Sequence, residues 1–148
     1  MPSIEVRVAR HDDFDAWMPL WRGYQAFYQV DIADDVSRLT WQRFFDDAEP
    51  MFCALVTVDG VARGLVHSIE HRSCWTKEPS CYLQDLFVAP PFRGLRLGRR
   101  LIEHVYAQAK ARGSTRVHWL THETNVDAMK LYDRIASRSG FVQYRKAL

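Results

Sequence analysis

The chain has 148 residues, of which 47% are hydrophobic and 26% charged. This combination is typical of a globular domain with its own core and excludes an intrinsically disordered chain. No uninterrupted apolar run approaches the roughly 18 residues of a membrane span, and neither a signal-peptide pattern nor a CxxC motif is present. We therefore expect one domain over residues 1–148, in the reducing cytoplasm, without a metal site or a membrane partner.

The net charge of +2 is unevenly distributed along the chain. Residues 1–60 carry 5 Lys/Arg against 11 Asp/Glu, whereas residues 61–148 carry 15 against 7. An acidic half and a basic half suit an enzyme with an anionic cofactor and a cationic partner. Ordinary solvated surface gives the same pattern, so charge alone does not decide between the two.

Hydrophobic periodicity predicts alternating strands and helices along the whole chain. In chain order we expect a strand at Ile4–Ala9, a helix from Asp12 or Asp13 to Tyr28, a helix at Ser37–Asp47, strands at Met51–Val58, Val61–Glu70 and Ser80–Val88, a helix at Gly98–Arg112, a strand at Thr115–Leu120, a helix at Asn125–Arg138 and a strand at Phe141–Arg145. The order β-α-α-β-β-β-α-β-α-β predicts an α/β fold, with a mixed sheet and helices on its faces.

Local signals mark several ends of these elements. Asp59-Gly60 is a strong hairpin signal between two apolar runs, and Gly113 suits the end of a helix. Asp12 or Asp13 and, further on, Ser37 are expected to cap the two N-terminal helices. Pro19 is expected to kink the first of them or to shift its start.

The stretch Val88–Leu101, VAPPFRGLRLGRRL, joins a predicted strand to a predicted helix. It holds two glycines and four arginines. A helix N-terminus offers free backbone N–H groups, and glycines let a backbone approach a ligand closely. The stretch therefore predicts a site for an anion, most simply a phosphate.

Two motifs, with LQDLFVAP ahead of them, resemble the signatures of the GNAT superfamily of acetyl-CoA-dependent N-acetyltransferases. Arg93–Gly98, RGLRLG, matches the family's Q/R-x-x-G-x-G/A after a strand and at the start of a helix. Asn125–Tyr132, NVDAMKLY, followed by Gly140-Phe141, matches the family's second landmark. The resemblance covers nearly the whole chain and implies the GNAT fold, with a mostly antiparallel central sheet, and acetyl transfer from acetyl-CoA.

The resemblance implies a binding site for acetyl-CoA at the strand-to-helix junction. Backbone N–H groups of Leu95 to Arg100 would hold the pyrophosphate, with arginine side chains around the phosphates. The strand just upstream would bind the pantetheine arm, and a backbone N–H near Phe87 or Val88 would stabilise the oxyanion. The implied cofactor-binding residues are Leu86, Phe87, Val88, Arg93, Gly94, Leu95, Arg96, Leu97, Gly98, Arg99, Arg100, Asn125 and Tyr132.

Arg96 stands where the family has its first signature glycine. A non-glycine residue held at positive φ costs about 1–2 kcal/mol. Because Gly94 and Gly98 still flank the turn, we expect Arg96 to have an ordinary helical φ and to add positive charge near the cofactor.

Tyr132 is the residue for which the resemblance implies the role of general acid. Direct transfer to an amine in a ternary complex releases coenzyme A as a thiolate, to which a phenol can donate a proton. The helical spacing by itself equally fits a tyrosine of the core. Asn125 is expected to cap the same helix.

The proton acceptor for the incoming ammonium group is open at the sequence level. Asp85 and Glu123 are the nearby carboxylates, and Gln84, which cannot take a proton, is able to position a water. A water relay without either carboxylate is the third possibility.

The acceptor site is expected at the first two helices and the loop between them. Aromatic and acidic side chains suit an ammonium group, and the candidates are Trp21, Tyr24, Tyr28, Asp31 and Trp41. They favour a small cationic amine, either a polyamine or an amino-acid-like molecule, whereas core packing is the simpler role for most of them. Protein lysines, aminoglycosides and an acetyl-CoA sensor without turnover remain alternatives, a homodimer is compatible with the aromatic content, and a nucleic-acid partner is disfavoured.

Overall fold

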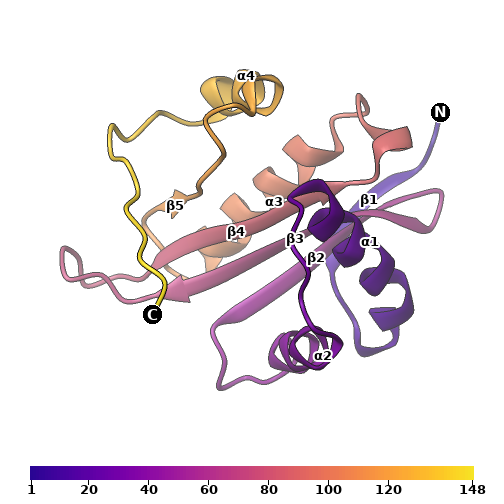
Figure 1. The fold of residues 1–148 in the computed structure, drawn as a ribbon, viewed down its shortest axis with the longest axis horizontal. Coiled ribbons are helices and arrows are strands. Elements are labelled where there is room, and N and C mark those ends of the chain that lie inside the picture. The colour runs from indigo at the N-terminus through magenta and orange to yellow at the C-terminus, as the bar shows by residue number, and fades with distance from the viewer.

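A five-stranded sheet forms the centre of the computed structural model, which describes residues 1–148 (Figure 1). The strands lie side by side in chain order: β1 (Ile4–Val8), β2 (Met51–Val58), β3 (Val61–His71), β4 (Ser80–Val88) and β5 (Val117–His118). The pairs from β1 to β4 are antiparallel, and β4 and β5 are parallel. The helices are α1 (Phe14–Phe27), α2 (Asp34–Arg43), α3 (Leu97–Ala111) and α4 (Val126–Ile135), with short 3-10 helices at His11–Asp13 and Pro90–Phe92. No helix is long and apolar enough to cross a membrane.

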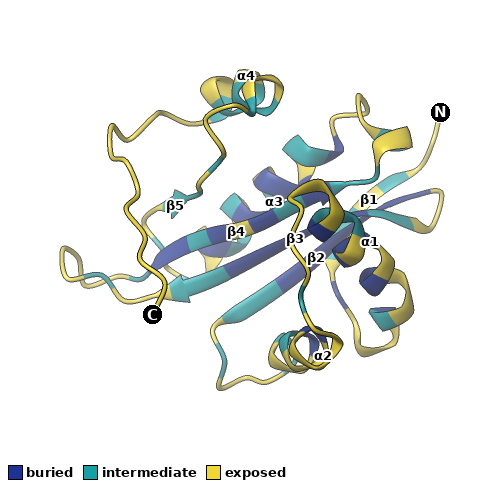
Figure 2. Cartoon of the chain, viewed as in Figure 1, coloured by how far each residue is buried: buried dark blue, intermediate teal, exposed yellow.

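Two hydrophobic clusters lie on opposite faces of the sheet, because neighbouring residues of a strand point to opposite sides. In β2, Ala54 and Val56 pack with α3, whereas Cys53 and Leu55 pack with α1 and α2. Figure 2 shows the buried residues concentrated in the central strands and on the inner sides of α1 and α3. The expected arrangement, with helices on both faces of a mixed sheet, is confirmed.

The hairpin between β2 and β3 turns at Asp59-Gly60, as expected. Both residues have positive φ, 51° and 81°, which is the backbone conformation that the tightest two-residue hairpin turn requires. The register then pairs Val58 with Val61 directly across the turn.

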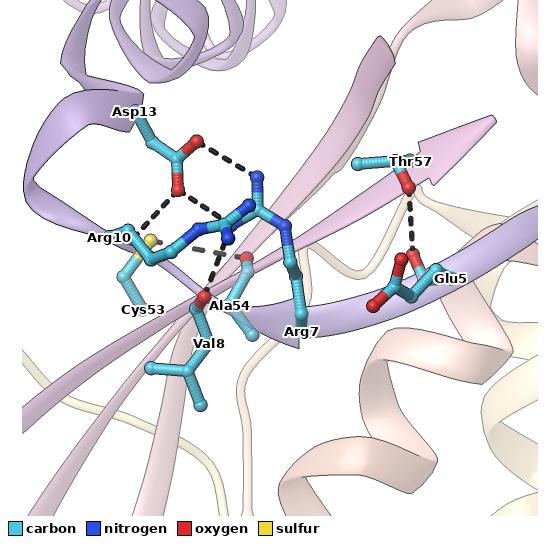
Figure 3. Close-up of polar contacts among 8 residues, drawn as sticks. All are labelled: Glu5, Arg7, Val8, Arg10, Asp13, Cys53, Ala54 and Thr57. Carbon is cyan, nitrogen blue, oxygen red and sulfur yellow. Dashed lines mark hydrogen bonds and ion pairs between the residues drawn. The ribbon is translucent and has the colours of Figure 1, made fainter. Parts of the chain in front are cut away.

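Asp13 precedes α1, but its side chain does not cap the helix. Its carboxylate instead accepts hydrogen bonds from both terminal nitrogens of Arg7, at 2.6 and 2.9 Å, and from the backbone N–H of Arg10 at 2.7 Å (Figure 3). The guanidinium of Arg7 lowers the pKa of Asp13 below its usual value. The ion pair of Arg7 and Asp13 therefore connects the start of α1 to β1. α1 begins at Phe14 and continues past Pro19, which does not shift the start of the helix.

The expected capping role of Ser37 is wrong. α2 begins three residues earlier, at Asp34, so that Ser37 lies inside the helix and is fully buried. Its hydroxyl accepts a hydrogen bond from the indole N–H of Trp21 at 3.1 Å. A serine next to polar residues looks like a cap in the sequence, but here it satisfies a buried donor of the core.

The C-terminal elements are shorter than expected, and the last one is absent. The predicted strand Thr115–Leu120 is reduced to Val117–His118, and the predicted helix Asn125–Arg138 to Val126–Ile135. The predicted strand Phe141–Arg145 is irregular chain, in which Phe141 and Tyr144 are 80% and 93% exposed. Alternating apolar residues describe a strand only where a neighbouring strand supplies hydrogen bonds, and this segment pairs with none.

Candidate active site

A one-residue bulge in β4 arranges the residues at the centre of the site. His67 of β3 pairs with Asp85, whereas the next residue, Ser68, pairs with Leu83, so that Gln84 is the extra residue of β4. A bulge shifts the alternation of the side chains by one position. Leu83 therefore packs in the cluster under α3, while Asp85 turns toward the α1 side, where His67 lies.

β4 and β5 separate beyond a short parallel pairing of Cys81 and Tyr82 with Val117 and His118. An open cleft of about 500 Å³ lies where the two strands diverge. Its lining residues come from α1 and the residue after it, β4, α3, the segment after β5, α4 and the C-terminal segment: Tyr24, Tyr28, Tyr82, Leu83, Gln84, Asp85, Leu86, Ile102, Trp119, Leu120, Thr121, His122, Tyr132, Gln143 and Arg145. From Leu83 onward the outer edge of β4 has no strand beside it, and its backbone groups are open to a ligand.

Asp85 is a buried carboxylate at the wall of this cleft, with 8% of the residue exposed. Its Oδ2 lies 2.9 Å from Nδ1 of His67, which is itself 3% exposed. Burial, followed by the negative charge of Asp85 and a hydrogen bond to it, raises the pKa of Tyr24 well above its usual value. Tyr24 therefore stays protonated and lines the same cleft as Asp85.

Tyr132 reaches the cleft from α4. Its ring packs edge-on against Trp119, with 5.4 Å between the ring centroids. Burial, followed by the effect of Tyr28, raises the pKa of Tyr132 to about 12. The phenol is therefore protonated at neutral pH and available as a donor. Tyr106 of α3 holds the end of α4 in place by donating to the carbonyl of Ile135 at 2.9 Å.

The segment between β4 and α3 presents a row of free backbone donors. None of the N–H groups from Gly94 to Arg99 donates a hydrogen bond within the protein. They surround the N-terminus of α3, where the helix dipole favours an anion. The junction therefore has unpaired backbone donors of the kind that an anion site uses, and the anion site stays a prediction.

The expectation of an ordinary helical φ at Arg96 is wrong. Arg96 has φ 59° and ψ 25°, in the left-handed region, and it directly precedes the first residue of α3. Gly94 has a φ of 94°. The turn into α3 requires positive φ at both positions, so the chain carries strain at Arg96 that the family's glycine avoids.

The four arginines of the junction do not all point to an anion. The Nε of Arg93 donates to the carbonyl of Val88 at 3.2 Å, and its guanidinium lies over the rings of Phe27 and Phe87. Arg99 pairs with Glu103 at 2.8 Å. Arg96 and Arg100 are exposed and engaged with no acidic side chain.

Several residues predicted for the site lie elsewhere. Trp21 and Trp41 belong to the buried cluster under α1 and α2, and neither lines the cleft. Asp31 and Glu123 are exposed and lie outside the cleft lining. Asn125 precedes α4, but its amide donates to Thr121 Oγ1 at 3.2 Å and caps no backbone N–H.

Other residues of the site carried too little signal in the sequence. Tyr82, Trp119, His122, Gln143 and Arg145 line the cleft because two strands diverge there, which no spacing encodes. His67 stands as a polar residue within the apolar run GLVHS of β3, a weak sign of a buried polar partner. The bulge itself leaves a trace, because apolar alternation from Cys81 to Leu83 resumes at Leu86 with the opposite parity.

Comparison with known families agrees with this geometry. Residues 15–136 match the model of the acetyltransferase (GNAT) family, and the chain belongs to that family. It is 34% identical to the D-amino-acid N-acetyltransferase HPA3 of Saccharomyces cerevisiae over 145 aligned residues. The alignment covers 97% of this chain and 90% of HPA3. The chain is 28% identical to the L-ornithine N5-acetyltransferase NATA1 of Arabidopsis thaliana over 80 aligned residues, which are 54% of this chain and 35% of NATA1. The protein is an N-acetyltransferase.

Solved structures confirm the fold. The aminoglycoside acetyltransferase AAC(6′)-Iy, bound to a bisubstrate analogue of coenzyme A, superposes with a TM-score of 0.84 at 18% identity over 99% of both chains. A probable acetyltransferase superposes with a TM-score of 0.85 at 22% identity over 97% of both chains. At these identities the likeness extends to the fold and not to the acceptor.

Replacing Arg96 with glycine is expected to stabilise the protein. Glycine removes the cost of positive φ, about 1–2 kcal/mol, and its greater freedom in the unfolded chain offsets part of that gain. Arg96→Gly should raise the free energy of unfolding by up to about 1 kcal/mol, measured by urea denaturation. Arg100→Gly, inside α3, is the matched control and should lower it by about 1 kcal/mol. A loss of similar size in both variants would contradict the strain at Arg96.

Proposed function

We propose that the protein transfers the acetyl group of acetyl-CoA to the primary amine of a small, amino-acid-like molecule, by direct attack in a ternary complex. The observation that carries this proposal is one cleft that holds a buried carboxylate, Asp85, and a protonated phenol, Tyr132, beside an open strand edge. The carboxylate of Asp85 would accept the proton of the incoming ammonium group. The phenol of Tyr132 would donate a hydrogen bond to the departing sulfur.

Acetyl-CoA fits the basic end of this arrangement. The free N–H groups from Gly94 to Arg99 would bind its pyrophosphate, and the exposed side chains of Arg96 and Arg100 would add positive charge. The open edge of β4 at Leu86 to Val88 would hold the pantetheine arm and direct the thioester into the cleft. A backbone N–H at Phe87 or Val88 would stabilise the oxyanion that forms on the acetyl carbonyl.

Asp85 is the proton acceptor that the geometry favours. An amine is mostly protonated at neutral pH and attacks only after it has lost a proton. Asp85 lies at the cleft wall, whereas Glu123 is exposed outside it. The amine nitrogen, freed of one proton, forms a bond to the acetyl carbon as the carbon–sulfur bond breaks, and it then loses a second proton to solvent to give the neutral amide. Gln84 is exposed at the bulge and would hold a water near the same position.

Tyr132 would donate a hydrogen bond to the sulfur as the thiolate leaves. A thiol with a pKa of about 8.5 is a stronger acid than a phenol with a pKa of about 12. The phenol therefore stabilises the thiolate chiefly as a hydrogen-bond donor, and the final proton on sulfur comes at little cost from solvent. We therefore propose that Tyr132 acts as a hydrogen-bond donor to the thiolate, and not as the full proton donor that the motif implies.

The cleft and the relatives together favour a small amino acid or a related diamine as acceptor. The aromatic rings of Tyr24, Tyr28 and Tyr82 line the cleft beside Asp85, and such rings bind an ammonium group favourably. Arg145 lies in the same lining and offers a positive charge to a carboxylate. The relatives named for D-amino acids and for L-ornithine act on molecules of this class.

A panel of amines tests the proposed activity directly. The purified protein, acetyl-CoA and separate sets of D- and L-amino acids, ornithine, polyamines, aminoglycosides and lysine peptides are incubated, and products heavier by one acetyl group are identified by mass spectrometry. Acetylated amino acids or ornithine are the expected products. Exclusive acetylation of peptides would refute the acceptor class, and binding of acetyl-CoA without any product would favour a sensor.

Two carboxylate variants distinguish the proton acceptors. Asp85→Asn should lower kcat/KM for the amine by about 100-fold or more, since general base catalysis contributes 10²–10⁴-fold. Glu123→Gln, an equivalent change outside the cleft, should leave it within about twofold. The reverse order would assign the role to Glu123, and no loss in either variant would leave water as the acceptor.

A further inference from the structure

A buried chain of hydrogen bonds links the core under α1 to the cleft. The indole Nε1 of Trp17 lies 2.9 Å from Nε2 of His67, and Nδ1 of His67 lies 2.9 Å from Oδ2 of Asp85. The three residues are 0%, 3% and 8% exposed. They come from α1, β3 and β4, so the chain spans the junction of three elements.

The direction of these hydrogen bonds follows from the chemistry of the groups. An indole N–H only donates, so Nε2 of His67 must accept and carries no proton. An imidazole has at least one N–H, which must then be on Nδ1, and it donates to Asp85. Trp17 therefore keeps His67 neutral and fixes its tautomer, and Oδ2 of Asp85 is an acceptor.

Aromatic packing fixes the orientation of the His67 ring. The rings of Trp17, Trp21 and Phe44 surround it, with centroid distances of 5.8, 4.9 and 4.8 Å. A flipped ring would place a C–H against the indole and leave a buried donor without an acceptor, at a cost of about 1–3 kcal/mol. A single orientation of the ring thus presents one N–H to Asp85.

We propose that Trp17 and His67 are positioning residues that hold the Asp85 carboxylate in the orientation needed to take the acceptor's proton. The inference rests on the proposed role of Asp85. One carboxylate oxygen is bound by His67, which leaves the other for a ligand in the cleft. Because Nε2 of His67 is closed off by Trp17, no proton passes from Asp85 into the core through His67. Asp85 must therefore return its proton to the cleft.

Substitutions along the chain separate positioning from simple packing. His67→Leu removes both hydrogen bonds, whereas the amide N–H of His67→Asn takes the place of Nδ1 and keeps a donor for Asp85. Trp17→Phe removes only the indole donor. Leu55→Val, a truncation in the same cluster at a residue that takes no part in these two hydrogen bonds, is the control for lost stability. Thermal unfolding of each variant confirms that it is folded at the assay temperature.

The kinetic result expected is a loss in kcat alone. His67→Leu should lower kcat by about 100-fold and Trp17→Phe by about tenfold, with KM for acetyl-CoA within about twofold, since misplacing a reacting group by about 1 Å has effects of this size. His67→Asn should recover about tenfold of the loss in His67→Leu. Equal kcat values for His67→Leu and Leu55→Val would overturn the proposal.

A spectroscopic readout does not depend on turnover. In protein labelled with ¹⁵N-histidine, the shifts of His67 at neutral pH should show a protonated Nδ1 and an unprotonated Nε2, and Trp17→Phe should disturb this signature. A protonated Nε2 in the unaltered protein would overturn the proposal. An inactive Asp85→Asn with fully active Trp17 and His67 variants would overturn this inference alone, whereas a fully active Asp85→Asn would remove the proposed role of Asp85 and this inference with it, and would leave the proposed acetyl transfer standing with water as the proton acceptor.

Discussion

The bulge at Gln84 sets the geometry on which the cleft depends, because side chains of a regular strand alternate strictly between its two faces. With an unbroken alternation from Leu83, Asp85 would point into the apolar cluster under α3, where a carboxylate has no partner. The extra residue turns Asp85 to the opposite face, toward His67 and Tyr24. Burial of Asp85 is tolerated there because its carboxylate accepts a hydrogen bond from His67.

The ends of the cleft are arranged by two other departures from regular structure. β5 leaves β4 after two paired residues, which opens the strand edge and brings Trp119 and Tyr132 to the cleft. At the start of α3, Gly94 and Arg96 have positive φ, and the consecutive N–H groups from Gly94 to Arg99 donate no hydrogen bond within the chain. Each irregularity leaves backbone groups unpaired within the chain, and these are the groups that we propose to bind acetyl-CoA.

The sequence predicted the elements with strong local signals and missed those that depend on distant partners. Asp59-Gly60 defined its hairpin, and the bounds of β4 were predicted correctly, because turn chemistry and apolar alternation are local. Phe141–Arg145 has the alternation of a strand but no neighbour to pair with. At Arg96 the residue type argued against positive φ, yet the turn imposes it. The motif predicted Tyr132 at the site, whereas His67 and Trp17 are separated by 50 residues and share no pattern.

The proposed mechanism requires the claim that Asp85 and Tyr132 act on the two ends of the same transfer. A crystal structure with a bisubstrate molecule, coenzyme A joined through its sulfur to a small amine, tests it most directly. We predict the sulfur within hydrogen-bonding distance of the Tyr132 hydroxyl, and the amine nitrogen in contact with Asp85 directly or through one water. An amine nitrogen held next to Glu123, or a sulfur remote from Tyr132, would contradict the claim.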